Sequence, residues 1–149
     1  MKGTLTLFCG KMGSGKSTLS KQVAENTNAV IVSEDEWLEN LFPNKISSLE
    51  DYVEYSSTIK PLVKSVVQDF LKNGVDVVMD FPANTDKQRQ WLYSITDTYH
   101  LYYLDVSDEE CLSRISKRGR PTDTPEMFWL LNKHFTMPEK YSVFMMRSK

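Results

Sequence analysis

Short apolar runs alternate along the chain with segments in which apolar residues recur every three to four positions. The runs predict strands at residues 5–9, 29–32, 75–80, 101–106 and 141–147. Helical periodicity predicts helices at residues 17–26, 34–42, 49–72, 85–96 and 107–118, with a last helix beginning at residues 124–125. Because strands and helices alternate, we expect a parallel sheet covered by helices on both faces.

Polar residues mark where several of these helices begin and end. Capping boxes are expected at Ser33 with Glu36, Thr85 with Gln88 and Ser107 with Glu110. The periodic positions of the longest predicted helix are Tyr52, Tyr55, Ile59, Val63, Val66 and Phe70. Pro61 lies inside this segment, so we expect a kink there or a division into two helices.

A glycine-rich octapeptide follows the first predicted strand and opens the first predicted helix. It fits G-x-x-x-x-G-K-[ST] in full, which is the phosphate-binding P-loop pattern. A backbone that wraps a polyphosphate must point its N–H groups inward, and glycines permit that approach. We expect the nucleotide-binding residues to be Gly10, Lys11, Met12, Gly13, Ser14, Gly15, Lys16, Ser17 and Thr18.

Roles within the loop follow from side-chain chemistry. Lys16 supplies a positive charge to the β- and γ-phosphates of ATP, and the Ser17 hydroxyl supplies an oxygen to Mg²⁺. A dinucleotide fingerprint is disfavoured, because Thr18 stands where the third glycine would be needed. Adenine is preferred over guanine because no guanine-reading Asn-Lys-x-Asp motif is present.

The composition and charge of the chain narrow the classes of protein to which it can belong. The chain has 149 residues, 40% hydrophobic and 26% charged, and a formal net charge of -2. These values predict one cytoplasmic globular domain over residues 1–149 without general attraction to nucleic acid or membrane. Neither a signal peptide nor a membrane-spanning run is expected. Cys9 and Cys111 have no metal-ligand spacing, so we interpret them as buried, reduced thiols.

Further segments resemble one branch of the P-loop proteins. They are Ser33-Glu34-Asp35-Glu36-Trp37, residues 77–85 with residues 88–91, Tyr103-Leu104-Asp105-Val106, Arg114-Ile115-Ser116-Lys117-Arg118 and residues 124–129. With the octapeptide, they resemble the kinase-like P-loop ATP-binding proteins of the AAA-domain family, which is related to polynucleotide kinases, zeta toxins and chloramphenicol phosphotransferase. The resemblance implies a three-layer α/β sandwich with about five mostly parallel strands in the order 2-3-1-4-5.

The resemblance also implies roles for two carboxylates. Asp35 follows the second strand, where kinases of this branch place the group that accepts the proton of the acceptor hydroxyl. Glu34 and Glu36 compete for this role, and Asp35 is also explained as a partner of the helix dipole. Asp80 ends the third strand, where ligands bind in open α/β sheets, and we interpret it as a second Mg²⁺ group beside Ser17. A strand-terminating turn is its alternative explanation.

The remaining candidates are basic. In the relatives, the helix after strand four and the lid beyond it supply arginines to the nucleotide. Arg114 and Arg118 are therefore catalytic candidates, with a short lid around residues 117–125. A solvated helix face explains the same cluster. Arg89 is the candidate for the acceptor side or the γ-phosphate, with surface exposure as its alternative; Asn84 precedes its helix and shapes the turn.

The acceptor pocket is expected between the Asp35 helix, the long helix and residues 81–85. Six aromatic residues are candidates to line it or to belong to the core: Trp37, Phe42, Tyr52, Tyr55, Phe81 and Trp91. Many relatives carry an arginine where this chain has Leu38, which weakens the case for an acceptor phosphate or carboxylate.

The main hypothesis is an ATP-dependent phosphotransferase acting on a hydroxyl of a small molecule, as a monomer or homodimer. Two alternatives stay open. One is an ATP-binding switch without an acceptor. The other is a nucleic-acid 5′-hydroxyl kinase, which the acidic net charge disfavours.

Overall fold

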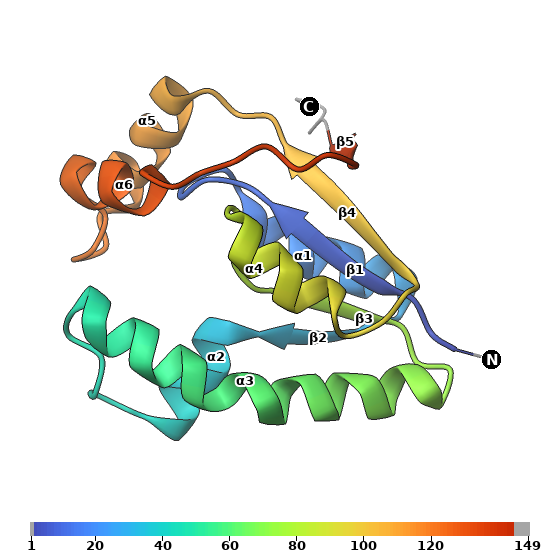
Figure 1. Cartoon of the computed structure of the whole chain (residues 1–149). Coiled ribbons are helices and arrows are strands. Elements are labelled where there is room, and N and C mark those ends of the chain that lie inside the picture. The colour runs from blue at the N-terminus through green and yellow to red at the C-terminus, as the bar shows by residue number, and fades with distance from the viewer. Residues whose placement is uncertain (1, 145–149) are drawn as a thin grey trace.

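The computed structural model describes residues 2–144, which form an α/β sandwich (Figure 1). The strands in this range are β1 (Leu5–Cys9), β2 (Val30–Ser33), β3 (Val77–Asp80), β4 (Tyr99–Leu104) and β5 (Ser142–Phe144). They form one sheet in the order β2-β3-β1-β4-β5, and each neighbouring pair is parallel. The predicted fold class and strand order are therefore confirmed.

The helices alternate with these strands along the chain. Their bounds are α1 (Lys16–Thr27), α2 (Glu34–Leu41), α3 (Leu49–Lys72), α4 (Asp86–Tyr93), α5 (Asp108–Arg118) and α6 (Pro125–Asn132). The bounds of α3 match the periodic segment at both ends, because Ser48 caps its start and Asn73 ends it. None of the helices within residues 2–144 is long and apolar enough to cross a bilayer.

The strand starts that differ most from the sequence-based expectation are those of β4 and β3. Strand β4 begins at Tyr99, two residues before the predicted start, because Tyr99 pairs with Leu5 of β1. Strand β3 begins at Val77 rather than Val75, because the backbone N–H of Val75 bonds back to Phe70 at the end of α3. Of the last predicted strand, residues 145–147 lie outside the described part of the chain.

Pro61 does not divide α3, so that part of the prediction was wrong. The helix is continuous through Pro61, and Ile59 and Val63 on either side of it are buried. Burial of these two side chains against the sheet holds both turns in place although one backbone hydrogen bond is lost.

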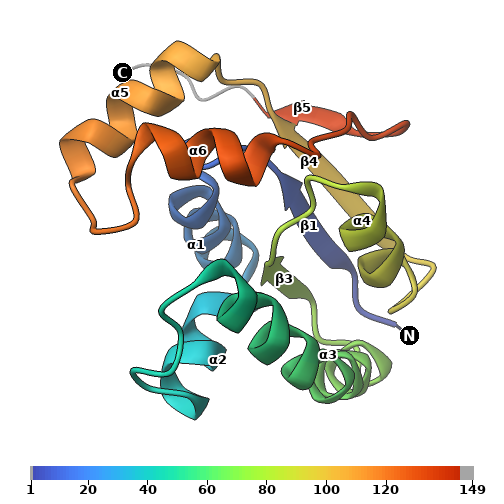
Figure 2. The ribbon, with the colours of Figure 1, turned by 60° about the vertical axis from the view of Figure 1, so that its left-hand side comes forward.

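The two faces of the sheet are covered by different helices. On one face, Leu7 and Met79 pack with α3 and α4 through side chains such as Val67 and Leu92. On the other face, Phe8 and Val78 pack against Leu19 and other residues of α1. Helices α5 and α6 pack on each other at the carboxyl edge of the sheet (Figure 2). The carboxyl ends of β1 and β3 therefore lie between α6 on one side and α2 and α3 on the other (Figure 2).

Candidate functional site

The P-loop joins β1 to α1 through two glycines in left-handed conformation. Gly13 has φ 82° and Gly15 has φ 93°, and Gly15 is the N-cap of α1. No side chain caps this helix, so its first backbone N–H groups are available to an anion. At Gly13 an added Cβ would lie 2.7 Å from the Cys111 carbonyl oxygen and 2.8 Å from Ile115 Cγ2. The loop therefore requires glycine there both for its conformation and for its contact with α5.

Two side chains hold the loop from outside. Asn84 accepts a hydrogen bond from the Gly10 backbone N–H (3.0 Å) and donates one to the Gly10 carbonyl (2.9 Å). Arg114 donates from Nη1 to the Ser14 carbonyl (3.1 Å). Asn84 thus braces the start of the loop, whereas sequence analysis gave it only a turn-forming role. Arg114 contacts the backbone of the loop and Glu110, and it does not line the cavity described next.

A cavity of about 600 Å³ lies in front of the P-loop. Its floor is the loop and the start of α1, including Lys16, Ser17 and Thr18. One side is formed by residues 34, 35, 46–49 and 52, which we call the α2–α3 wall. The opposite side is formed by Arg118 at the end of α5, by the loop between α5 and α6, and by α6, including Leu131. This volume is typical of a small-molecule site.

Most of the predicted nucleotide-binding residues face this cavity. Gly10, Lys11, Met12, Gly13, Gly15, Lys16, Ser17 and Thr18 line it, whereas Ser14 is buried in the loop. The Lys11 ammonium lies 2.8 Å from an Asp108 oxygen and 4.9 Å from the centre of the Phe135 ring. Lys11 is therefore anchored to the start of α5 and to the segment after α6.

Lys16 and Asp80 meet at the base of the cavity. The Lys16 ammonium lies 3.7 Å from an Asp80 carboxylate oxygen, and Ser17 lines the same cavity. Hydroxyl and carboxylate oxygens are the ligands that Mg²⁺ takes from proteins, with water and phosphates completing its coordination. Residues 2–144 contain no group of three His, Cys, Asp or Glu side chains suited to a metal. Ser17 and Asp80 would suit an ion that is shared with a nucleotide.

Two neighbouring carboxylates open α2 on the α2–α3 wall. Ser33 caps the helix by accepting a hydrogen bond from the Glu36 backbone N–H. Asp35 and Glu34 both line the cavity, but Asp35 is exposed and Glu34 is only 3% exposed. Glu34 accepts hydrogen bonds from the Tyr52 hydroxyl and from Ser56 Oγ (2.8 Å), both on α3. Glu34 thus ties α2 to α3, and this leaves Asp35 as the accessible carboxylate.

Burial raises the pKa values of the Glu34 carboxyl and of the Tyr52 hydroxyl that bonds to it. Desolvation raises the pKa of the Glu34 carboxyl, although the hydrogen bonds from Tyr52 and Ser56 oppose that effect. Desolvation and the adjacent Glu34 raise the pKa of the Tyr52 hydroxyl. The hydroxyl therefore stays protonated and keeps donating to Glu34 across the physiological range.

The raised pKa predicts a pH-dependent effect of Glu34→Gln. A carboxyl whose folded pKa exceeds its unfolded pKa binds more protons in the folded state, so its contribution to stability falls as pH rises between the two values. We expect the free energy of unfolding of Glu34→Gln, relative to the unmodified chain, to increase as pH rises above the unfolded pKa of a glutamate, about 4.3. Urea unfolding at a series of pH values measures this difference. Glu36→Gln, an exposed carboxylate in the same turn, should show no such trend. A difference for Glu34→Gln that stays constant or falls with pH would contradict the prediction.

Arg118 is held by Asp123 at the rim of the cavity. Its Nε and Nη2 atoms each lie 2.7 Å from an Asp123 oxygen, and the Arg120 backbone N–H also donates to this carboxylate (3.0 Å). These hydrogen bonds lower the pKa of Asp123. Asp123 was not among the residues predicted from the sequence. Its place five residues after Arg118, in a turn-rich segment, could have indicated an ion pair between the two. Arg118 faces the cavity with its orientation set by this pair.

The structure does not bring Arg89 to the site, and this corrects the sequence-based interpretation. Arg89 is 3% exposed and does not line the cavity. Its guanidinium donates to the Ala83 carbonyl (2.8 Å), to Asp86 (3.0 Å) and to Thr136 Oγ1 (2.6 Å). Arg89 therefore joins the start of α4 to the segment after α6. Its position one turn into a capped helix fits this structural role as well as the catalytic one.

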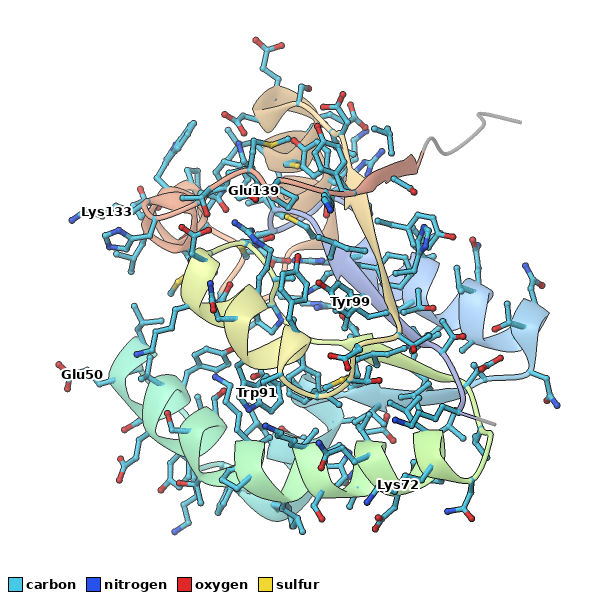
Figure 3. All side chains as sticks on the ribbon, turned by 45° about the vertical axis from the view of Figure 1, so that its right-hand side comes forward. Glu50, Lys72, Trp91, Tyr99, Lys133 and Glu139 are labelled. Carbon is cyan, nitrogen blue, oxygen red and sulfur yellow. The ribbon has the colours of Figure 1, made fainter. Side chains whose placement is uncertain are left out.

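Only one of the six aromatic candidates lines the cavity. That residue is Tyr52. The rings of Phe42 and Tyr55 pack together at 4.5 Å, and Phe81 packs on Trp91 at 5.7 Å. Trp91 lies between α4 and α3 (Figure 3), where the Lys60 ammonium lies 5.6 Å from its ring centre. Trp37 packs on the same core and lines a separate, smaller pocket beside β2.

Comparison with known proteins agrees with this geometry. The AAA domain family model matches residues 5–130. Adenylate kinase from Prochlorococcus marinus (strain AS9601) is 26% identical over 130 residues, covering 80% of this chain and 71% of that protein. Adenylate kinase from Ureaplasma urealyticum serovar 10 is 25% identical over 149 residues, covering 89% of this chain and 65% of that protein. The chain thus spans about two thirds of the length of these relatives.

The fold also matches solved kinase structures. The structure of the Mycobacterium tuberculosis APS kinase in complex with AMPPNP and APS superposes with a TM-score of 0.67 at 16% identity, covering 95% of this chain and 87% of that chain. An identity this low establishes the shared fold alone. Because the family match extends over most of the chain and includes the P-loop, the protein belongs to the AAA domain family, in its kinase-like, nucleotide-binding P-loop branch.

Proposed function

We propose that this chain is an ATP-dependent phosphotransferase that moves the γ-phosphoryl group of ATP to a hydroxyl of a small molecule. The observation that carries the proposal is the shared cavity: Lys16 of the P-loop and the accessible carboxylate of Asp35 both line it. The α2–α3 wall extends this cavity beyond the phosphate-binding loop. That wall offers an acceptor a place beside the γ-phosphate.

The proposed reaction is an in-line transfer of the γ-phosphoryl group. The acceptor oxygen forms a bond to the γ-phosphorus, and the bond from this phosphorus to the β,γ-bridging oxygen breaks. The electron pair of the broken bond leaves on ADP, and the proton of the acceptor hydroxyl passes to the Asp35 carboxylate and then to solvent. Such a transition state is loose, so positioning and charge stabilisation contribute more than strong basicity.

The other side chains have supporting roles in this proposal. Lys16 neutralises the β- and γ-phosphates, and Ser17 and Asp80 hold Mg²⁺, which neutralises developing charge when bound. Arg118 reaches the transferring phosphoryl group from the rim, oriented by Asp123. Residues 119–124 act as a short lid that excludes water from the transfer. Arg114 supports the loop backbone through the Ser14 carbonyl.

Replacing Asp35 by asparagine tests the role of the carboxylate. We expect acceptor-dependent ADP formation to fall by about 10- to 100-fold, because the amide cannot take up the proton. Binding of the non-hydrolysable analogue AMPPNP with Mg²⁺ should be little changed. ADP formation is measured with and without a panel of sugars, nucleosides and antibiotics.

The matched control is Glu36→Gln, which removes an exposed carboxylate one residue further along the same helical turn. Its rate should equal that of the unmodified chain. Full transfer by Asp35→Asn would remove Asp35 from the proposed role. If no compound in the panel, and no oligonucleotide 5′-hydroxyl, stimulated ADP formation while AMPPNP still bound, a nucleotide-dependent switch would be favoured instead.

A further inference from the structure

The charges around the cavity are distributed unevenly. Its four basic side chains all belong to the P-loop, to the end of α5 or to the loop that follows it; they are Lys11, Lys16, Arg118 and Arg120. The α2–α3 wall contributes two carboxylates, Glu34 and Asp35, and no basic residue. The rest of this wall presents hydroxyl and apolar groups, including Ser47, Ser48 and Leu49. An acceptor seated on this wall would therefore meet negative charge and neutral donors.

The basic side chains are also largely engaged. Lys11 is paired with Asp108, Lys16 lies beside Asp80, and Arg118 is held by both oxygens of Asp123. The cavity lining as a whole contains as many carboxylates as cations, four of each. Arg120 is the fourth cation; its backbone N–H donates to Asp123, and it lies on the side of the cavity opposite the α2–α3 wall. We expect the phosphates of a bound nucleotide to draw on these cations first. Lys133 follows Asn132 at the end of α6, but it is exposed and points away from the body of the molecule (Figure 3).

A neutral amide faces the same cavity. Asn132, at the end of α6, lines it, and its side-chain oxygen and nitrogen are both buried without a hydrogen-bond partner among the described residues. Buried amide groups without a partner destabilise a protein, so they usually mark a place that a ligand or water completes. An amide offers one donor group and one acceptor group, which suits hydroxyl, amide or amine groups of a ligand.

We propose that the acceptor carries no phosphate, sulfate or carboxylate group and is recognised through neutral hydroxyl, amide or amine groups by the α2–α3 wall and Asn132. This inference rests on the proposed function, because it specifies which hydroxyl compounds the phosphotransferase accepts. A phosphorylated acceptor on this wall would lie beside the accessible carboxylate of Asp35, and the wall itself supplies no cation to compensate the phosphate. Desolvating such an anion is costly. The inference therefore predicts that AMP is not an acceptor.

AMP is the informative probe, because the aligned relatives are adenylate kinases and AMP differs from adenosine only by its phosphate. The full-length chain is first loaded with Mg²⁺ and AMPPNP, and this uptake is measured by calorimetry. AMP and adenosine, and then glucosamine 6-phosphate and glucosamine, are titrated into the loaded protein. We expect AMP to bind no more tightly than adenosine and the sugar phosphate no more tightly than the sugar. With ATP in place of the analogue, AMP should yield no ADP above the rate without an acceptor.

A variant with an added positive charge tests the inference even if neither the phosphorylated compound nor its counterpart without phosphate binds well. Leu49→Arg places a guanidinium on the α2–α3 wall at an exposed position (37% exposed). It should strengthen AMP binding about tenfold, because a charge-assisted hydrogen bond to phosphate becomes available. Val53→Arg, one turn further along α3, exposed and outside the cavity, adds the same charge and should leave AMP binding unchanged.

The outcomes separate the two proposals. Conversion of AMP to ADP by the unmodified chain, tighter binding of the phosphorylated member of either pair, or an unchanged AMP affinity in Leu49→Arg would each overturn the inference about the acceptor. Failure of Mg²⁺ and AMPPNP to bind at all would instead contradict the proposed function. That result is read in the loading step, before any acceptor is added.

Discussion

Replacing Lys16 by alanine should weaken binding of Mg²⁺ and AMPPNP by about 100-fold, with a loss of ATP-dependent transfer of at least the same size. The ammonium lies 3.7 Å from Asp80 at the base of the cavity, where it balances that carboxylate and faces the phosphate position. Its removal takes away a charge-assisted contact and also leaves Asp80 to repel the phosphates. A hydrogen bond to a charged group is typically worth about 1.5–3 kcal/mol, and a 100-fold change in affinity corresponds to about 2.7 kcal/mol. Isothermal titration calorimetry at fixed ionic strength measures the change in affinity.

Lys21→Ala is the matched control for this experiment. Lys21 lies on α1 five residues beyond Lys16, is exposed, and does not line the cavity. Its replacement removes the same charge and should leave the affinity within twofold, because exposed charges at a distance are screened by salt. If Lys16→Ala bound the nucleotide as well as Lys21→Ala does, the assignment of the octapeptide as the phosphate site would be wrong.

The second large effect is expected on stability, from Gly13→Ala. The new methyl group would lie 2.7 Å from the Cys111 carbonyl oxygen and 2.8 Å from Ile115 Cγ2, and the residue would have to keep φ 82°. The left-handed conformation costs about 1–2 kcal/mol, and the contact with backbone adds about 1–3 kcal/mol of overpacking. We therefore expect the free energy of unfolding, measured by urea denaturation, to fall by about 2–5 kcal/mol.

Gly119→Ala separates the steric contribution from the conformational one. Gly119 ends α5 with φ 68°, but a Cβ there would meet no atom within 4 Å. This variant should lose only the conformational part, about 1–2 kcal/mol. Equal destabilisation by the two variants would show that contact between the P-loop and α5 does not constrain the loop. Because Gly13 lies in the nucleotide cradle, Gly13→Ala should also weaken AMPPNP binding, whereas Gly119→Ala should have a smaller effect.

Much of the fold could be predicted because its signals are local. Strand β1 and helix α3 begin and end at the predicted residues, since an apolar run or a periodic face flanked by a capping serine and an Asn-Gly pair needs no distant partner to be recognised. The capping box at Thr85 and Gln88 is present in full. Strand β4 was misplaced by two residues because its start is set by pairing with Leu5, nearly a hundred residues earlier.

In the candidate site too, features with local sequence signals could be predicted, and those that depend on distant contacts could not. The P-loop residues were predictable because the contiguous octapeptide carries its own chemistry, and the structure brings Lys16, Ser17, Asp35 and Asp80 to one cavity. The arginines were not predictable in the same way. Arg89 and Arg114 have similar sequence contexts to Arg118, yet only Arg118 lines the cavity, whereas Arg89 is buried beside Thr136 and Arg114 bonds the loop backbone.

The amino-acid sequence by itself determined the family, the phosphate-binding loop and the alternation of strands and helices, because these depend on backbone requirements within a few consecutive residues. Only the tertiary structure decided which polar side chains face the cavity and which are used inside the protein. Glu34 and Asp35 are adjacent, yet one is buried under Tyr52 and Ser56 and the other is open to the cavity. Desolvation and hydrogen bonding give these two carboxylates different chemistry, and both depend on helix α3, whose contacts are distant in the sequence.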